Sequence, residues 1–136
     1  RTEAAKQAAR GAYIVAEASG RPDIILVASG SEVSTLVDGA SLLSAEGIKA
    51  RVVSVPSEGL FRKQDRQYQD AVITPGIPVF CLTAGLPVTM LGLAGSEGRI
   101  WGFDSFGYSA PYQVLDEKFG FTGQNVFEQV KKQLGR

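Results

Sequence analysis

Three consecutive residues could bind an anion. Gly30, Ser31 and Glu32 follow a short apolar run and open a segment with helical spacing. The junction of a strand with a helix N-terminus is the usual place for phosphate or carboxylate binding. The same residues also suit a tight turn followed by a serine that caps the helix. A dinucleotide fingerprint needs the pattern G-x-G-x-x-G, and only one of those glycines is present, so the turn and cap interpretation is favoured.

Cys81 and a group of aromatic residues are the other side chains of chemical interest. Cys81 is the only cysteine, and its neighbours are apolar. No base or positive charge beside it would lower its pKa, which predicts an inert core residue rather than a nucleophile. The aromatic side chains of Trp101, Phe103, Phe106 and Tyr108 favour core or interface packing over a stacking site. One short loop cannot bury them all, so we expect Phe106 and Tyr108 to contact another domain or subunit.

The residue types that are absent exclude much catalytic chemistry. The 136 residues include no histidine, the commonest general base and metal ligand. With one cysteine and no histidine, a structural zinc site and a Cys–His nucleophile are excluded. Neither the G-x-x-x-x-G-K-[ST] phosphate loop nor the G-x-S-x-G elbow occurs. We therefore assign no catalytic, cofactor-binding or metal-binding residue to this chain.

The charge balance narrows the range of partners. Fourteen basic and fourteen acidic side chains cancel, so the electrostatic footprint of a nucleic-acid or membrane-surface binder is missing. No apolar run approaches the length of about 18 residues that a membrane-spanning helix needs. A single cysteine fits a reducing cytoplasm. A run of mixed charge predicts a solvated helix face rather than a partner surface; it comprises Lys63, Asp65, Arg66 and Asp70.

Strand and helix patterns alternate along the chain. Strands are expected at 24–28, 51–55, 79–82 and 99–103, with an edge strand added at 13–15. The apolar run 24–28 is uninterrupted, so it needs cover on both faces and should lie near the centre of the sheet. Strands separated by helical crossovers predict a three-layer α/β fold, with a mostly parallel sheet of four to five strands and helices on both faces.

The expected helices are marked by their caps. Ser31 can cap a helix in which Val33, Leu36, Val37, Ala40 and Leu43 recur at helical spacing, and Gly47 suits a left-handed C-cap. Further helical segments, each inferred from spacing, caps or turn signals, are expected at 57–61 (a short turn or helix), 63–72, 109–119 and 122–134. Residues 1–10 are expected to connect to a missing upstream domain, because they are charged, rich in alanine and begin without Met. Residues 11–136 then form the domain itself.

Several stretches resemble the C-terminal domain of the bacterial, plant and yeast transketolases. They occur in the family's order over nearly the whole chain and are Arg10–Val15, Ala28–Val33, Ala45–Ser57, Phe61–Asp65, Phe106–Pro111, Glu117–Thr122 and Asn125–Val126. Residues 83–100 match the family poorly. There Thr83 stands where Glu is usual, and Met90 stands where Trp is common.

The resemblance implies an enzyme that transfers a two-carbon ketol unit from a ketose phosphate to an aldose phosphate in the pentose phosphate pathway. Such enzymes are homodimers that use thiamine diphosphate and a divalent metal, Mg²⁺ or Ca²⁺. The cofactor is held by pyrophosphate-binding and pyrimidine-binding domains, which also supply the catalytic residues. The chain is accordingly expected to be a non-catalytic domain that supports the structure and the dimer. The alternative is a free-standing regulatory or anion-binding α/β module, and the parent reading frame would distinguish the two.

Overall fold

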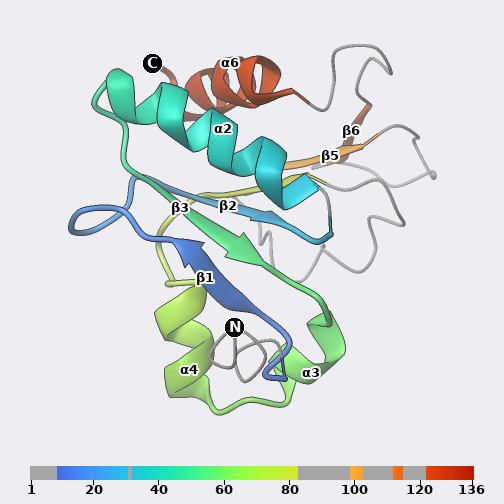
Figure 1. Ribbon diagram of the computed structural model, residues 1–136. Coiled ribbons are helices and arrows are strands. Elements are labelled where there is room, and N and C mark those ends of the chain that lie inside the picture. The colour runs from blue at the N-terminus through green and yellow to red at the C-terminus, as the bar shows by residue number, and fades with distance from the viewer. Residues whose placement is uncertain (1–8, 31, 83–98, 103–111, 115–121) are drawn as a thin grey trace.

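Strands are interspersed with helices in the part of the chain that the structure describes (Figure 1). This computed structural model describes residues 9–30, 32–82, 99–102, 112–114 and 122–136. The strands are β1 (Tyr13–Ala16), β2 (Ile24–Ala28), β3 (Ala50–Ser54), β4 (Val79–Leu82), β5 (Arg99–Gly102) and β6 (Tyr112–Val114). The helices are α2 (Glu32–Ala45), α3 (Glu58–Arg62), α4 (Arg66–Val72) and α6 (Gly123–Leu134). None of the described helices has the length and apolar character needed to cross a membrane.

The strands form one mostly parallel sheet in the order β1-β3-β2-β4-β5-β6. Among the strands that the structure describes, only the pairing of β1 with β3 is antiparallel. The α/β class, the mostly parallel sheet and the edge position of β1 are confirmed. β2 has neighbours on both sides and none of its five residues is exposed, as its unbroken apolar run predicts. Within the described residues the sheet has six strands, whereas four to five were expected.

The extra strand corrects one prediction. The segment 109–119 was expected to be a helix capped by Ser109, but its described residues, Tyr112–Val114, form β6. Ile100 and Trp101 of β5 pair with Tyr112 and Gln113 in parallel register. An aromatic and a β-branched residue two positions apart suit a pleated strand, and the open edge of β5 provides backbone partners that a local cap pattern does not reveal. The other residues of the expected helix lie outside the described part of the chain.

Helices cover both faces of the sheet, so the three-layer prediction is confirmed. α2 and α6 lie on one face and α3 and α4 on the other (Figure 1). Successive residues of a strand point to opposite faces, and β2 therefore contributes to two cores. Ile24, Leu26 and Ala28 pack with Leu36 and Leu43 of α2 and with Val126 and Val130 of α6. On the other face, Ile25 and Val27 pack with Phe61 of α3 and Val72 of α4.

Several helix ends follow the sequence predictions. Gly47 follows α2 with a φ of 79°, the left-handed conformation that favours glycine. The Thr122 side chain caps α6 by accepting from the Asn125 amide at 3.1 Å. Ser57 caps α3 in the same way. The helix expected from residue 63 begins only at Arg66, because Lys63 is the C-cap of α3 and the Asp65 side chain caps α4.

The first described segment is fixed to the α3–α4 face. The backbone oxygen of Gly11 accepts from the Ser57 amide at 3.0 Å, and that of Ala12 accepts from the Tyr68 hydroxyl at 2.7 Å. The Arg10 guanidinium lies over the Tyr68 ring, 4.7 Å from its centre. Gly11 has a φ of 89°, and a Cβ there would lie 2.2 Å from the Phe61 nitrogen. Only glycine can therefore place the chain this close to α3.

Candidate functional site

The turn before α2 contains a glycine in the left-handed conformation, and the helix begins with a carboxylate. Gly30 has a φ of 63°, and its carbonyl accepts from the Val33 amide at 3.3 Å. Glu32 is in the first turn of α2, where its charge complements the positive end of the helix dipole. A carboxylate in this position also opposes an incoming anion, so the arrangement favours the tight turn. Ser31 lies outside the described residues, and the anion site at Gly30, Ser31 and Glu32 stays a prediction.

The aromatic interface prediction concerns residues that the structure does not describe. Phe103, Phe106 and Tyr108 lie outside the described ranges. Trp101 is placed only through its backbone in β5. Contact of Phe106 and Tyr108 with another domain or subunit therefore stays a prediction.

Cys81 is buried in β4, with no exposed surface. It belongs to the core between the sheet and the α3–α4 layer. Burial raises the pKa of its thiol from 9.0 to about 12. A thiol held in its protonated form at neutral pH is a poor nucleophile and a poor metal ligand. The prediction of an inert core residue agrees with this environment.

The run of mixed charge lies on the exposed side of α4 and just before it. Asp65 caps the helix by accepting from the Tyr68 amide at 2.8 Å. Arg66 and Asp70 are one turn apart, with a closest nitrogen–oxygen distance of 3.7 Å. All four side chains of the run are exposed or half-buried. This is the solvated helix face that opposite charges at helical spacing predict.

Arg51 is a buried charged residue whose role the sequence did not reveal. It lies in β3 with only 8% of its surface exposed. Its Nε donates to Glu17 Oε1 at 2.8 Å. One terminal nitrogen donates to the carbonyls of Ala71 and Val72, at 3.1 and 3.0 Å, and to Thr74 Oγ1 at 2.9 Å. The cation thus joins β3 to the C-terminus of α4. A positive charge at this end also interacts favourably with the helix dipole. The sequence feature that could have indicated this role is the single arginine within the otherwise uncharged strand β3.

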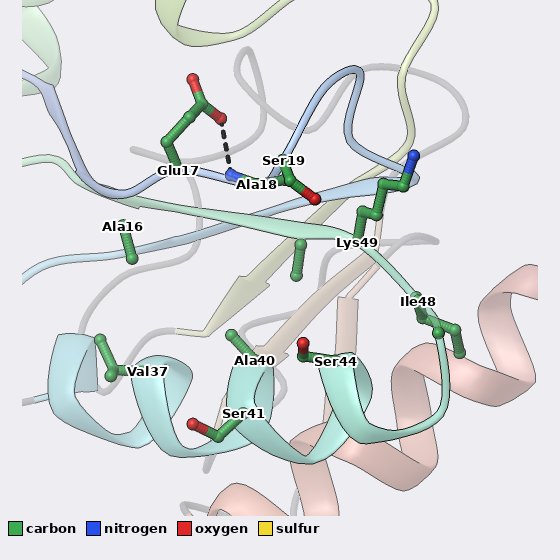
Figure 2. A pocket seen from close by; sticks show the side chains of 12 residues that line it. Ala16, Glu17, Ala18, Ser19, Val37, Ala40, Ser41, Ser44, Ile48 and Lys49 are labelled. Atoms are coloured by element: carbon green, nitrogen blue, oxygen red, sulfur yellow. Dashed lines mark hydrogen bonds between the residues drawn. The ribbon is translucent and has the colours of Figure 1, made fainter.

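A groove of about 510 Å³ lies between α2 and the β1–β3 end of the sheet. In Figure 2, the side chains of Val37, Ala40 and Ser44 face the strands, and that of Ala16 points toward the helix. Glu17 points away from the groove and accepts from the Ala18 amide at 2.9 Å. Segments that are separate in the sequence meet at this groove, and no local sequence pattern predicted the groove. The full lining is Ala16, Glu17, Ala18, Ser19, Val37, Ala40, Ser41, Ser44, Gly47, Ile48, Lys49 and Ala50.

The described residues do not provide the ligands of a metal centre. No group of three or more His, Cys, Asp or Glu side chains is close enough to hold an ion within them. The groove offers hydroxyls and one ammonium group rather than the cluster of carboxylates and carbonyls that Mg²⁺ or Ca²⁺ needs. These residues therefore do not fit a thiamine diphosphate–metal pair, and no catalytic step is assigned to them.

Comparison with known proteins identifies the family. Residues 11–122 match the family described as "Transketolase-like TK C-terminal domain". The chain belongs to this family. Transketolase 2 of Vibrio parahaemolyticus is 43% identical to it over 127 residues, which are 93% of the chain and 19% of that enzyme. The chain thus spans about one fifth of the length of the curated transketolases that it matches.

Solved transketolase structures share the fold of this transketolase C-terminal domain. The transketolase from Leishmania mexicana superposes with a TM-score of 0.75 at 36% identity, covering 96% of this chain and 19% of that protein. A split-gene transketolase, described as an inactive β4 tetramer, has a TM-score of 0.64 at 28% identity, covering 91% and 42%. The relatives of this chain are thus transketolases, and the chain matches one part of them.

Proposed function

We propose that the chain is the non-catalytic C-terminal domain of a transketolase. The intact enzyme would transfer a two-carbon ketol unit from a ketose phosphate to an aldose phosphate in the cytoplasmic pentose phosphate pathway. Thiamine diphosphate and a divalent metal would be held by the pyrophosphate-binding and pyrimidine-binding domains. Residues 1–10 would connect residues 11–136 to those domains, and the intact enzyme would be a homodimer.

The absence of histidine is the observation that carries this proposal. A transketolase must move protons at the ketose and aldose, and histidine is the side chain best suited to this near neutral pH. None occurs in the 136 residues. The single thiol is buried, with its pKa raised to about 12. An inactive tetramer of split-gene transketolase chains, which contain a matching domain, supports the view that such a domain does not suffice for activity.

The role left for the domain is structural support. Phe106 and Tyr108 are proposed to contact the rest of the enzyme. Three large apolar side chains are exposed in the described part of the chain, and the two most exposed, Val15 in β1 and Leu60 in α3, could extend such contacts.

A domain exchange tests this proposal. In transketolase 2 of Vibrio parahaemolyticus, the 127 matching residues would be replaced by this chain. A second variant would lack those residues altogether. We expect the chimera to keep ketol transfer and the parent's assembly state in size-exclusion chromatography, and the deletion variant to lose both. A chimera that folds and assembles but is inactive would mean that the domain supplies a catalytic residue. A fully active deletion variant would contradict the supporting role.

A further inference from the structure

The chain enters the described domain at a corner formed by β1, the carboxyl end of β3 and α3. Tyr13, the first residue of β1, pairs with Ser54, the last residue of β3. The backbone ahead of β1 runs beside α3 (Figure 1), where the Gly11 carbonyl accepts from the Ser57 amide at 3.0 Å. The helices α2 and α6 lie on the other face of the sheet. The entry point therefore belongs to the α3–α4 side of the domain.

Contacts of three consecutive residues fix the direction of the entering chain. The Ala12 carbonyl accepts from the Tyr68 hydroxyl at 2.7 Å, and the Arg10 guanidinium lies 4.7 Å from the centre of the Tyr68 ring. Between them, Gly11 lies so close to α3 that a Cβ there would be 2.2 Å from the Phe61 nitrogen. The Tyr68 ring packs edge-on against that of Phe61, with 6.1 Å between the ring centres. We call these contacts of Arg10, Gly11 and Ala12 with α3 and α4 the entry clamp.

The entry clamp removes the hinge that a flexible linker would provide at the domain surface. Two domains joined by a loose linker reorient freely unless they share a large interface. Here the backbone is held as far out as Arg10, and both Gly11 and Ala12 are buried. The direction in which the preceding chain leaves α3 is therefore set by this domain rather than by the connector.

The length of the connector limits which side of the domain the preceding part of the enzyme can reach. This step rests on the proposed function, in which residues 1–10 join this domain to the cofactor-binding domains. The eight residues ahead of Ala9 span at most about 28 Å when fully extended. A helix with its side chains is about 10 Å across, so the two helical layers and the sheet between them approach that span. The α3–α4 side is within easy reach, whereas the outer side of α2 and α6 would need the entire connector.

We propose that the domain preceding this one in the same polypeptide docks against α3, beside the entry clamp. α3 presents Gly59 and Leu60 to it: a Cβ at Gly59 would meet nothing within 4 Å, and Leu60 is 43% exposed. The Leu60 carbonyl carbon would lie only 2.8 Å from a Cβ at Gly11, so this surface adjoins the tether directly. A short, fixed tether gives the attached domain a high effective concentration at the surface beside it. The preceding domain places apolar side chains on Leu60, and the outer side of α2 and α6 stays free of it.

Trypsin digestion of the full chain tests the entry clamp without any other domain. Cleavage after Arg10 requires the clamp to open, whereas cleavage after Arg51, which is buried in β3, requires the sheet to unfold. Tyr68→Phe removes the hydroxyl that donates to Ala12, and it should raise the cleavage rate at Arg10 relative to that at Arg51 about fivefold. Tyr13→Phe removes a hydroxyl without a hydrogen-bond partner among the described residues and should leave this ratio unchanged. An unchanged ratio in Tyr68→Phe would overturn the proposal, because the entry would not be clamped.

Photo-crosslinking in the chimera described above tests which face is covered. Leu60→p-benzoylphenylalanine would be introduced into the Vibrio parahaemolyticus transketolase 2 that carries this chain as its C-terminal domain. Leu42 of α2 is 38% exposed and would receive the same substitution as the matched control on the opposite layer. After irradiation, mass spectrometry should find crosslinks from position 60 to the preceding domains of the same chain. These crosslinks should be at least about fivefold more abundant than any from position 42.

The products separate this proposal from its alternatives. Crosslinks to the preceding domains from position 42 but not from position 60 would overturn it, as would an active chimera that gives none from either position. A covalent dimer formed from position 60 would also overturn it, because α3 would then face the partner subunit. A chimera that neither assembles nor transfers ketol units would count against the proposed function instead, and the trypsin digestion would still decide whether the clamp exists.

Discussion

Arg51 and Cys81 are both buried, but their surroundings differ in the hydrogen-bond partners that they provide. The Arg51 guanidinium donates to four acceptors, which come from the Glu17 side chain after β1 and from the end of α4. Cys81 has no such partners to stabilise a thiolate, and burial alone sets the pKa of its thiol. A buried charge is tolerated only where fixed acceptors surround it, whereas a thiol can simply remain neutral.

Arg51→Met should destabilise the domain strongly. The substitution keeps most of the aliphatic stem but removes all four hydrogen bonds, and it leaves the carbonyls of Ala71 and Val72 without this partner. We expect the free energy of unfolding to fall by about 3 kcal/mol. Urea unfolding with an unchanged m-value would measure it. The matched control is Arg66→Met, which removes an exposed i,i+4 pair with Asp70 and should cost less than about 0.5 kcal/mol. Equal losses would mean that the Arg51 contacts contribute no more than surface pairs.

The buried thiol gives the stability a defined dependence on alkaline pH. The pKa of Cys81 is raised from 9.0 to about 12 on folding. Below the lower value the thiol is protonated in both states. Above it, the unfolded chain releases a proton that the folded chain retains, so stability is lost as pH rises. Between about pH 8.5 and about pH 10 this linkage should remove about 1 kcal/mol.

Chemical denaturation of the unaltered chain and of Cys81→Ala isolates this effect. Lysine and tyrosine side chains titrate in both proteins, and any cavity cost of the alanine is the same at every pH. The stability advantage of the unaltered chain over the variant should therefore shrink between the two pH values. Parallel pH profiles would show that the thiol ionises in the folded state as readily as in the unfolded one.

Local elements were predictable where the cause is local. The apolar run of β2 predicted its central position, and Thr122 and Gly47 predicted helix ends, because cap chemistry involves only neighbouring residues. β6 was wrongly expected to be helical, since its conformation depends on pairing with β5. Arg51 and the groove were missed for the same reason: their partners lie far away in the sequence. The register shift in β1, which leaves Val15 without a cross-strand partner, likewise depends on pairing with β3.

The crossing of α2 and α6 depends on glycine at their contact. A Cβ at Gly39 would lie 2.7 Å from Val126 Cγ1 and 2.9 Å from Val126 Cβ. Gly39→Ala should therefore force the two helices apart. The strain of about 1–3 kcal/mol should exceed the gain in helix propensity of about 1 kcal/mol. We expect a net loss of about 1 kcal/mol in thermal or urea unfolding.

The same substitution at Gly59 provides the control. Gly59 lies in α3, and a Cβ there would meet nothing within 4 Å. Gly59→Ala should be neutral or stabilise the domain by up to about 1 kcal/mol, because alanine loses less backbone entropy than glycine. Opposite signs at the two glycines would identify the helix contact as the cause. Stabilisation at both positions would mean that Val126 moves aside without cost.

At the scale of the whole molecule, the fold is a six-stranded sheet with a separate core on each face. The core under α2 and α6 also supports the groove, and the core under α3 and α4 holds Cys81 and fixes the first described segment. Neither core encloses a cluster of metal-ligating side chains in the described residues. Alternating patterns predicted this class of molecule, and the resemblance of whole stretches such as Ala45–Ser57 predicted the family, which the match over residues 11–122 confirms.

The chain by itself should neither bind thiamine diphosphate with useful affinity nor catalyse ketol transfer. A diphosphate is usually held through a divalent cation coordinated by several protein oxygens in fixed geometry, and the described residues include no such cluster. Isothermal titration calorimetry with thiamine diphosphate and Mg²⁺ should give no saturable heat in the micromolar range. Intact transketolase 2 of Vibrio parahaemolyticus provides the positive control under the same conditions. Saturable micromolar binding that requires Mg²⁺ would refute the non-catalytic assignment.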